Sequence, residues 1–535
     1  MKPRPSYDRN DLGLVLKPGR RDECAFLDRH RDPTGPYHQR MPRVPTVPAF
    51  ALVIATTVLL AAGCGRADKP NPVSVALGAI IDKKPAQSVK DEIWDDVHEF
   101  YRLREGKPAW VTDEPTAKAT DAFHTLQAAR EHGLNPADYK VDDLAQRREV
   151  LLAGKKDDPG RDGLLAELEA RITTALLSLG RDVAIGRTTP TVAGWKARRV
   201  APDLVGTLNS AAGDVAAWLA VIQPVHPEYE ALRGALMNLY GQQEQGSWGK
   251  APVGAAEVRV FQEHHGIKAS GVIDAATRAA MKVPIERRID QVKVNLERWR
   301  WMPDDLGAQH LMVNIPYYHL MARENGKTIK DIRVVVGKPG NETPVFSGVM
   351  ETVVFSPYWN IPDSIVQGET APAVAKDPKY LARNNMEILR VSAAGPTVVN
   401  PSDVNWDDPE ELRQLAFRQR PGSNNALGHV KFLFPNAHNV YLHDTPADAL
   451  FARTGRAFSH GCIRVEEPEE LAKYVLRSDA EWTAPQILMA MNSGTEKHVR
   501  LTETIPVHIV YFTAWVDGKK GLHFQPDVYG YDRQR

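Results

Sequence analysis

The chain has 535 residues, of which 43% are hydrophobic and 25% charged, a composition typical of a folded globular protein and not of a disordered chain. Its 67 basic residues balance 67 acidic residues, so the formal net charge of +0 argues against a nucleic-acid-binding protein, which needs a basic domain or stripe. The length predicts roughly three domains. The sequence contains no glycine-rich nucleotide-binding loop, so we expect no nucleotide cofactor.

The N-terminal region contains an apolar run from Phe50 to Gly63, followed by Cys64. The run is shorter than the roughly twenty residues of a spanning helix and is typical of a signal peptide. Ala62-Gly63-Cys64 resembles a lipoprotein processing site, which makes Cys64 a candidate for lipidation; a plain signal or an uncleaved anchor are the alternatives. A signal peptide starts just ahead of its apolar run, so we predict that Met41 is the true start. Residues 1–64 are thus an N-terminal extension with a signal or lipoprotein-like segment, which predicts a periplasmic or cell-envelope protein anchored to a membrane.

The chain contains three cysteines, at positions 24, 64 and 462. If translation starts at Met41, Cys24 is lost and Cys64 is acylated or removed, so Cys462 is the one thiol of the mature protein. Structural cysteines normally pair in an oxidising compartment. An unpaired exported thiol therefore indicates a chemical role.

Residues 65–88 show little periodicity, and we predict a tether. Residues 89–245 follow helical spacing repeatedly, as at Ile93 and Val97 and again at Leu168 and Ile172, and predict a helical scaffold domain. No recognisable chemistry lies in this domain.

Residues 246–284 contain apolar positions that fit a compact three-helix unit: Val258, Phe261, Ile267 and Ile273. The pattern resembles the small peptidoglycan-binding repeat, and the alternative is a generic helical subdomain. Two adjacent histidines, His264 and His265, do not predict a metal site, because neighbouring side chains on a helix point apart.

An amphipathic helix over residues 285–304 is expected to join two domains. From Leu311 the period changes to two, and Asn325-Gly326 and Asp517-Gly518 predict hairpins, so residues 305–535 are predicted to be a mostly β domain. One helix is expected after Pro468. Residues 367–406 interrupt the strands without a clear period, and we interpret them either as a lid or as a surface excursion without function.

The strongest motif is Ser459-His460-Gly461-Cys462-Ile463-Arg464, with His443 upstream. A thiolate is the reactive form of cysteine, and a neighbouring imidazole can generate it. Amides near Gly461 and Cys462 are candidates for stabilising an oxyanion. The alternatives are an inert buried cysteine, a zinc site, which would normally show paired ligand spacings, and a papain-like protease, in which the order of cysteine and histidine is reversed.

This motif, with residues 444–458 between His443 and the Ser-His-Gly-Cys segment, resembles the signature of the YkuD-type L,D-transpeptidases. Further segments resemble the large YcbB-like branch of that family: Arg420-Pro421-Gly422, Asn425-Ala426-Leu427-Gly428, Phe434-Pro435-Asn436 and His443-Asp444-Thr445-Pro446. The resemblance implies a multidomain α+β protein, with a helical scaffold, a three-helix peptidoglycan-binding domain and a mostly-β YkuD-like sandwich as catalytic domain.

The resemblance also implies roles for individual residues. Cys462 would be the nucleophile and His443 the general base and acid, oriented by the main-chain carbonyl of Asp444. Supporting, oxyanion or substrate-facing roles fall to His460, Gly461, Arg464, Tyr441, Tyr358, Trp359 and Ser459. No metal or organic cofactor is implied.

The implied activity is that of a murein L,D-transpeptidase, which forms 3-3 crosslinks between peptidoglycan tetrapeptide stems through a cysteine acyl-enzyme. Carbapenems would bind covalently to the same cysteine. An L,D-carboxypeptidase and a lipoprotein-to-peptidoglycan transferase share the acylation step and stay open as alternatives. A non-catalytic tether to peptidoglycan is the alternative from a different class.

Overall fold

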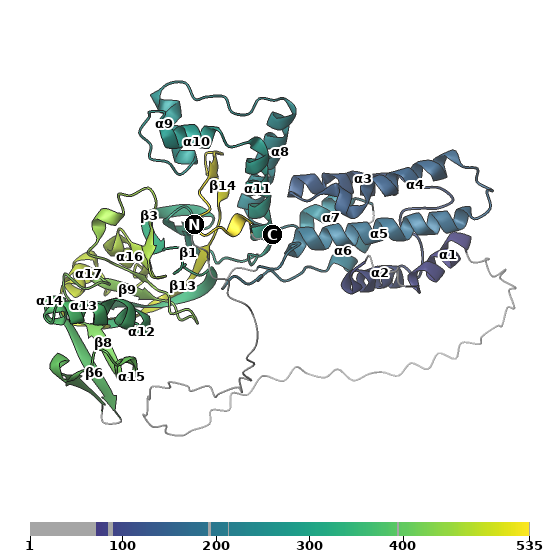
Figure 1. Cartoon of the computed structure of the whole chain (residues 1–535). Coiled ribbons are helices and arrows are strands. Elements are labelled where there is room, and N and C mark those ends of the chain that lie inside the picture. The colour runs from purple at the N-terminus through teal and green to yellow at the C-terminus, as the bar shows by residue number, and fades with distance from the viewer. Residues whose placement is uncertain (1–70, 84–88, 191–193, 212, 393–394, 534–535) are drawn as a thin grey trace, which may run out of the picture. The chain divides into compact units, whose positions relative to one another are not determined.

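The computed structural model describes residues 71–83, 89–190, 194–211, 213–392 and 395–533 (Figure 1). The predicted signal segment, Met41 and the lipidation candidate Cys64 lie outside these residues. Within the described ranges, the structure contains no helix with the length and apolar character needed to cross a bilayer.

The N-terminal part is helical, as predicted, and is organised around the long helix α5 (Arg161–Ile185). One face of α5 buries leucines and isoleucines at helical spacing, including Leu165, Leu168 and Ile172. Every one of the six helices α1 to α4, α6 and α7 contacts it. These helices are α1 (Pro72–Ile81), α2 (Asp91–Leu103), α3 (Ala117–Gln127), α4 (Val141–Ala153), α6 (Leu204–Ser210) and α7 (Val215–Ile222).

Part of the predicted tether is in fact a helix, α1 (Pro72–Ile81). The side chain of Asn71 accepts hydrogen bonds from the first free amides of the helix, and proline is tolerated in the first turn. Val73, Leu77 and Ile81 recur every four residues and are buried in the helical core. The prediction of a tether over residues 72–81 is therefore wrong, because a short apolar stripe without charged partners gives too weak a periodic signal.

The helical core contains one fully buried carboxylate, Glu169 of α5. Its two oxygens accept hydrogen bonds from the backbone amides of Ala109, Trp110 and Val111, at 2.7, 2.7 and 3.1 Å, and from the hydroxyl of Tyr101 at 2.9 Å. Burial raises the pKa of Glu169 to about 7, although these donors act in the opposite direction. The carboxylate thus ties an irregular segment to the central helix.

Along the chain, the helical core is followed by four helices before the first strand of the sheet: α8 (Pro227–Glu244), α9 (Ala255–His264), α10 (Ala275–Met281) and α11 (Ile285–Arg300). Helix α11 lies within residues 285–304, where the linking helix was expected, and packs on α8 and on β14. Only two helices, α9 and α10, form within residues 246–284, so the prediction of a three-helix unit is wrong among the described residues. The buried amide of Gln262 holds this region together through hydrogen bonds to Gly271, Val272 and Thr277.

The C-terminal part is built on a nine-stranded sheet of order β11-β3-β12-β10-β9-β4-β13-β1-β2, in which β2 also pairs with β3. The predicted Asn325-Gly326 hairpin joins β2 and β3, as expected. Helices α16 (Pro468–Val475) and α17 (Ala484–Met491) follow the motif. The strands are β1 (Gln309–Asn314), β2 (His319–Glu324), β3 (Lys327–Gly337), β4 (Phe346–Phe355), β9 (Val430–Leu433), β10 (Leu442–His443), β11 (Ala457–Ser459), β12 (Ile463–Val465) and β13 (Lys497–Val510).

A second hairpin, β14 (Ala514–Val516) and β15 (Leu522–Phe524), follows β13. Its turn contains Asp517-Gly518, as predicted. The hairpin contacts α8 and α11 through β14, and α9 through β15.

The insertion in the C-terminal part is a small α/β subdomain with its own core, not an irregular loop. A four-stranded sheet of order β5-β8-β6-β7 is covered by short helices. Its core contains Ile361, Val366, Ile388 and Phe417. The elements are β5 (Trp359–Ile361), α12 (Asp363–Ile365), a π-helical turn (Val366–Thr370), α13 (Ala371–Lys376), α14 (Tyr380–Arg383), β6 (Met386–Ser392), β7 (Gly395–Val399), α15 (Pro409–Arg413) and β8 (Leu415–Gln419).

We predict that Glu169→Gln destabilises the helical core by about 1–3 kcal/mol. The side-chain NH2 group of glutamine would face the backbone N–H groups that now donate to the carboxylate, and two donors cannot form a hydrogen bond. The folded-state pKa of Glu169 is raised above the unfolded value, so the stability linked to its protonation is present at low pH and is lost as pH rises toward 7. The destabilisation by the variant should therefore shrink between about pH 4.5 and 7. Urea unfolding followed by circular dichroism measures this difference. Glu167→Gln, on the same helix but partly exposed, is the control, and a pH-independent difference would contradict the assignment.

Candidate active site

The motif residues are brought together by the parallel pairing of β10 with β12. Leu442 lies opposite Ile463 and His443 opposite Arg464. The amide of Ile463 donates to the carbonyl of Tyr441 at 3.1 Å, which extends the pairing to the residue before β10. His443 ends β10, and Cys462 immediately precedes the adjoining strand β12.

The loop before Cys462 is fixed by hydrogen bonds within itself and to Thr343. Ser459 donates its hydroxyl hydrogen to the carbonyl of Cys462 at 2.5 Å, and the Gly461 amide donates to the Ser459 hydroxyl at 3.2 Å. Thr343 donates its hydroxyl hydrogen to the carbonyl of Gly461 at 2.7 Å. Gly461 has a φ of 118°, a conformation that only glycine adopts readily. The backbone at the cysteine is therefore held in one geometry.

Cys462 is a free, half-buried thiol whose Sγ lies 3.8 Å from the carbonyl oxygen of Asn439. Burial raises the pKa of the Cys462 thiol. Hydrogen bonds from the backbone and side chain of Tyr441, and the charge of Arg464, oppose that rise. The sulfur is thus partly accessible, and Tyr441 and Arg464 partly offset the effect of its burial.

His443 is buried, with 4% of its surface exposed, and its Nδ1 lies 2.5 Å from the main-chain oxygen of Asp444. A carbonyl oxygen only accepts hydrogen bonds, so Nδ1 carries the proton and Nε2 keeps its lone pair. Burial lowers the pKa of His443 to about 3, and the nearby charge of Arg464 adds to this effect. The imidazole is therefore neutral at physiological pH, in the tautomer that a general base requires.

The resting pair is a neutral thiol and a neutral imidazole, because the thiol pKa is raised and the imidazole pKa is lowered. Among the described residues, no hydrogen bond joins Sγ of Cys462 to the His443 ring. This differs from the ionised cysteine expected from the motif. The physical reason is that both groups are desolvated and Arg464 opposes a second positive charge beside it.

The comparisons with known proteins agree with this geometry. The model of the YkuD L,D-transpeptidase catalytic domain matches residues 308–508, and the model of a scaffold domain matches residues 95–236. A Haemophilus influenzae protein assigned by name as an L,D-transpeptidase is 34% identical over 244 residues, which are 46% of this chain and 48% of that protein. Residues 308–508 are thus similar to the catalytic domain of the YkuD L,D-transpeptidases.

The match spans about half the length of this curated relative, 48%. Among solved structures, an L,D-transpeptidase from Mycobacterium smegmatis is 12% identical with a TM-score of 0.19, over 38% of this chain and 58% of that chain. An L,D-transpeptidase in complex with imipenem is 14% identical with a TM-score of 0.18, over 38% of this chain and 59% of that chain.

Arg464 lies opposite His443 and is half-buried. Its Nε atom is buried and has no hydrogen-bond partner within the described part of the chain. Its charge lowers the pKa of both Cys462 and His443. With no carboxylate partner among the described residues, Arg464 favours the thiolate and disfavours a protonated imidazole.

The carboxylate of Asp444 supports the loop beyond β10 and does not point at the cysteine. One oxygen accepts the His429 amide at 2.7 Å, and the other accepts the amide of Thr445 at 2.6 Å. Gly428, with a φ of 59°, packs against this carboxylate so closely that a β-carbon there would lie 2.2 Å from Oδ2. The side chain of Asp444 therefore supports the loop, whereas its main-chain oxygen accepts the hydrogen bond from His443.

His460 connects the catalytic loop to the insertion subdomain. Its Nε2 lies 2.8 Å from Oε1 of Glu369, which belongs to the π-helical turn. Both side chains are partly exposed, at 35% and 55%. Sequence reasoning did not identify Glu369, because nothing in its neighbourhood marks a functional residue.

The remaining predicted residues differ in whether their polar groups are free to take part in the reaction. Ser459 is 2% exposed and its hydroxyl is used by the loop, so it positions the backbone and does not face a substrate. The Gly461 amide is likewise occupied, whereas the Cys462 amide has no hydrogen bond among the described residues and is the freer oxyanion donor. Tyr358 and Trp359 are half-buried where the insertion begins, with Tyr358 beneath the guanidinium of Arg418.

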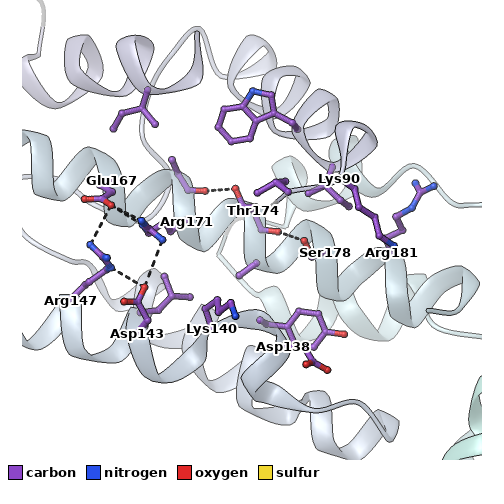
Figure 2. Close-up of a pocket in the computed structure, with 18 of the residues that line it drawn as sticks. Lys90, Asp138, Lys140, Asp143, Arg147, Glu167, Arg171, Thr174, Ser178 and Arg181 are labelled. Carbon is purple, nitrogen blue, oxygen red and sulfur yellow. Dashed lines mark hydrogen bonds and ion pairs between the residues drawn. The ribbon is translucent and has the colours of Figure 1, made fainter. Parts of the chain in front are cut away.

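A cavity of about 1050 Å³ lies within the helical core, and its lining includes neither Cys462 nor His443. Figure 2 shows the ion pairs along its wall, where Arg147 and Arg171 lie between Asp143 and Glu167. These charges neutralise one another, and no nucleophile is present among them. The size of this cavity therefore does not locate the active site.

We predict that the rate of alkylation of Cys462 by iodoacetamide rises with pH through a single ionisation above the ordinary pKa of a thiol, since only the thiolate reacts. Arg464→Gln removes the cation that favours the thiolate and shifts the profile to higher pH. His498→Gln, an exposed histidine elsewhere, leaves it unchanged. Mass spectrometry of the alkylated protein over a pH series measures these rates. An alkylation rate that is already high and constant at acidic pH would contradict the assignment of a neutral thiol and a neutral imidazole.

Proposed function

We propose that this protein is a murein L,D-transpeptidase that forms 3-3 crosslinks between peptidoglycan stems through an acyl-enzyme on Cys462. The observation that carries the proposal is the pairing of β10 with β12, in which His443 lies opposite Arg464, two residues after the half-buried thiol of Cys462. The matches to the YkuD catalytic domain and to the Haemophilus influenzae relative support it.

In the acylation step, Nε2 of His443 accepts the proton of the thiol as Sγ attacks the carbonyl carbon of the third stem residue. The oxyanion accepts a hydrogen bond from the Cys462 amide. The bond to the terminal D-alanine breaks, and that amine leaves with the proton from His443. A thioester on Cys462 results.

In the second step, the side-chain amine of another stem attacks the thioester carbonyl. His443 accepts the amine proton and returns a proton to the departing sulfur, which restores the resting pair. If water takes the place of the amine, the product is a shortened stem, as in an L,D-carboxypeptidase. Acceptor choice therefore depends on groups around the thioester and not on the nucleophile.

In this proposal the insertion subdomain covers the bound stems. The contact between His460 and Glu369 connects it to the catalytic loop. Its own core allows it to move as a unit, unlike an irregular loop. We also place the protein in the cell envelope, where its proposed substrate occurs. This location agrees with the signal-like segment of the sequence.

We predict that purified protein exposed to imipenem gains the mass of one inhibitor on Cys462, since a related solved structure is a complex with imipenem. Cys462→Ala gains none. His443→Gln slows acylation by about two to four powers of ten, the usual effect of losing an acid–base group. Intact-protein mass spectrometry with stopped time points gives the rates, and His498→Gln is the matched histidine control.

Turnover with purified disaccharide tetrapeptide distinguishes the proposed reactions. A crosslinked dimer with release of D-alanine is the expected product, and its absence in Cys462→Ala assigns it to this site. A shortened stem without dimer would replace the transpeptidase proposal by a carboxypeptidase. A protein that only retains peptidoglycan in a pull-down, with no product and no adduct, would be a tether.

A further inference from the structure

Three potential metal ligands from distant parts of the sequence meet where α9 packs on the β14–β15 hairpin. His264 is the last residue of α9, and Asp517 and His523 belong to the hairpin. One ligand atom of each lies within 4.8 Å of the others. The sequence did not indicate a site, because His264 and His265 diverge and the partners of His264 lie some 250 positions away in the chain.

Asp517 is fixed by the turn that contains it. Its Oδ1 accepts hydrogen bonds from the amides of Lys519 and Gly521, each at 2.8 Å. Its Oδ2 accepts from Nε2 of His523 at 2.9 Å. The turn therefore uses one carboxylate oxygen and directs the other toward the two histidines.

His523 is held by packing and is incompletely satisfied by hydrogen bonds. Its ring stacks on Trp515 with a centroid separation of 5.0 Å and an interplanar angle of 6°. It is 9% exposed, and its Nδ1 is buried without a hydrogen-bond partner among the described residues. A histidine with a purely structural role would normally have both nitrogens satisfied.

His264 approaches this pair closely, with 4.4 Å between its ring centroid and that of His523. A β-carbon at Gly521 would lie 2.7 Å from both Cε1 and Nε2 of His264, so this approach requires glycine in the turn. No hydrogen bond is made by the His264 ring within the described part of the chain. The ring is thus placed against the hairpin without a polar partner that explains its position.

We propose that His264, Asp517 and His523 form a binding site for a divalent transition-metal ion of the zinc type. Two imidazole nitrogens and one carboxylate oxygen suit zinc, cobalt or nickel better than calcium or magnesium, which prefer oxygen ligands. Ligand atoms around zinc lie about 3.3 Å apart at tetrahedral geometry, so the side chains close by an ångström or so, and water supplies the fourth ligand.

The ion would fasten the α9–α10 helices to the C-terminal hairpin. The hairpin is already packed on α8 and α11, and α9 contacts it through β15. His265, which follows α9, stacks on Phe261 and lies near the ring of Phe524. Metal binding would therefore set the position of the helices that resemble a peptidoglycan-binding repeat. This inference does not depend on the proposed transpeptidase reaction.

The test uses the whole chain with any affinity tag removed and carries Cys462→Ser in every sample, so that the thiol cannot bind the probe ion. Cobalt(II) is titrated and its visible absorption recorded, and zinc binding is measured by calorimetry. We expect one ion per chain and the intense absorption of tetrahedral cobalt. His264→Gln, Asp517→Asn or His523→Gln should each weaken binding by about tenfold or more. His498→Gln is the control on an exposed histidine, and His265→Gln is the control on the neighbouring position.

Hydrogen exchange provides a readout that separates binding from folding. In the parent protein, zinc should slow exchange of the α9 and hairpin amides, and in the three ligand variants it should not. Equal exchange of parent and variants without zinc shows that the variants fold. Cobalt or zinc bound as tightly by the variants as by the parent, or no binding at submillimolar ion, would overturn the proposal.

Discussion

The parallel contact between β10 and β12 is the constraint on which the rest of the catalytic domain depends. Both strands are short, and each is paired on both sides, β10 with β9 and β12 with β3. His443 and Arg464, which a long loop separates in sequence, therefore lie opposite each other inside the sheet. The flanking loop adds the fixed backbone of Ser459 and Gly461, so the sulfur is presented with little conformational freedom.

Burial governs the chemistry of the pair. Desolvation keeps both the thiol and the imidazole neutral, and the half-buried Arg464 biases them toward thiolate and neutral base. The resting thiol therefore carries no charge, and a permanently reactive anion does not form. The carbonyl of Asp444 completes this arrangement, because it fixes the tautomer without adding a charge.

The regular parts of the fold could be predicted because their signals are local. The Asn325-Gly326 turn, the amphipathic α11 and the Cys462 motif each depend on a few neighbouring residues. Helix α1 was missed, since its stripe is only three residues long, and the insertion was missed because its strands are short and bury a small core of their own. Glu369 and Asp517 could not be predicted as neighbours of His460 and His264, since both contacts arise from tertiary packing.

The pairing of β2 with β3 has a further effect on the domain as a whole. Because β2 pairs with β3, the chain of paired strands returns on itself, and the three-residue strand β11 is the terminal strand of the described sheet. Long free edges are where strands of separate molecules join and aggregate. A terminal strand of only three residues gives such association a short template.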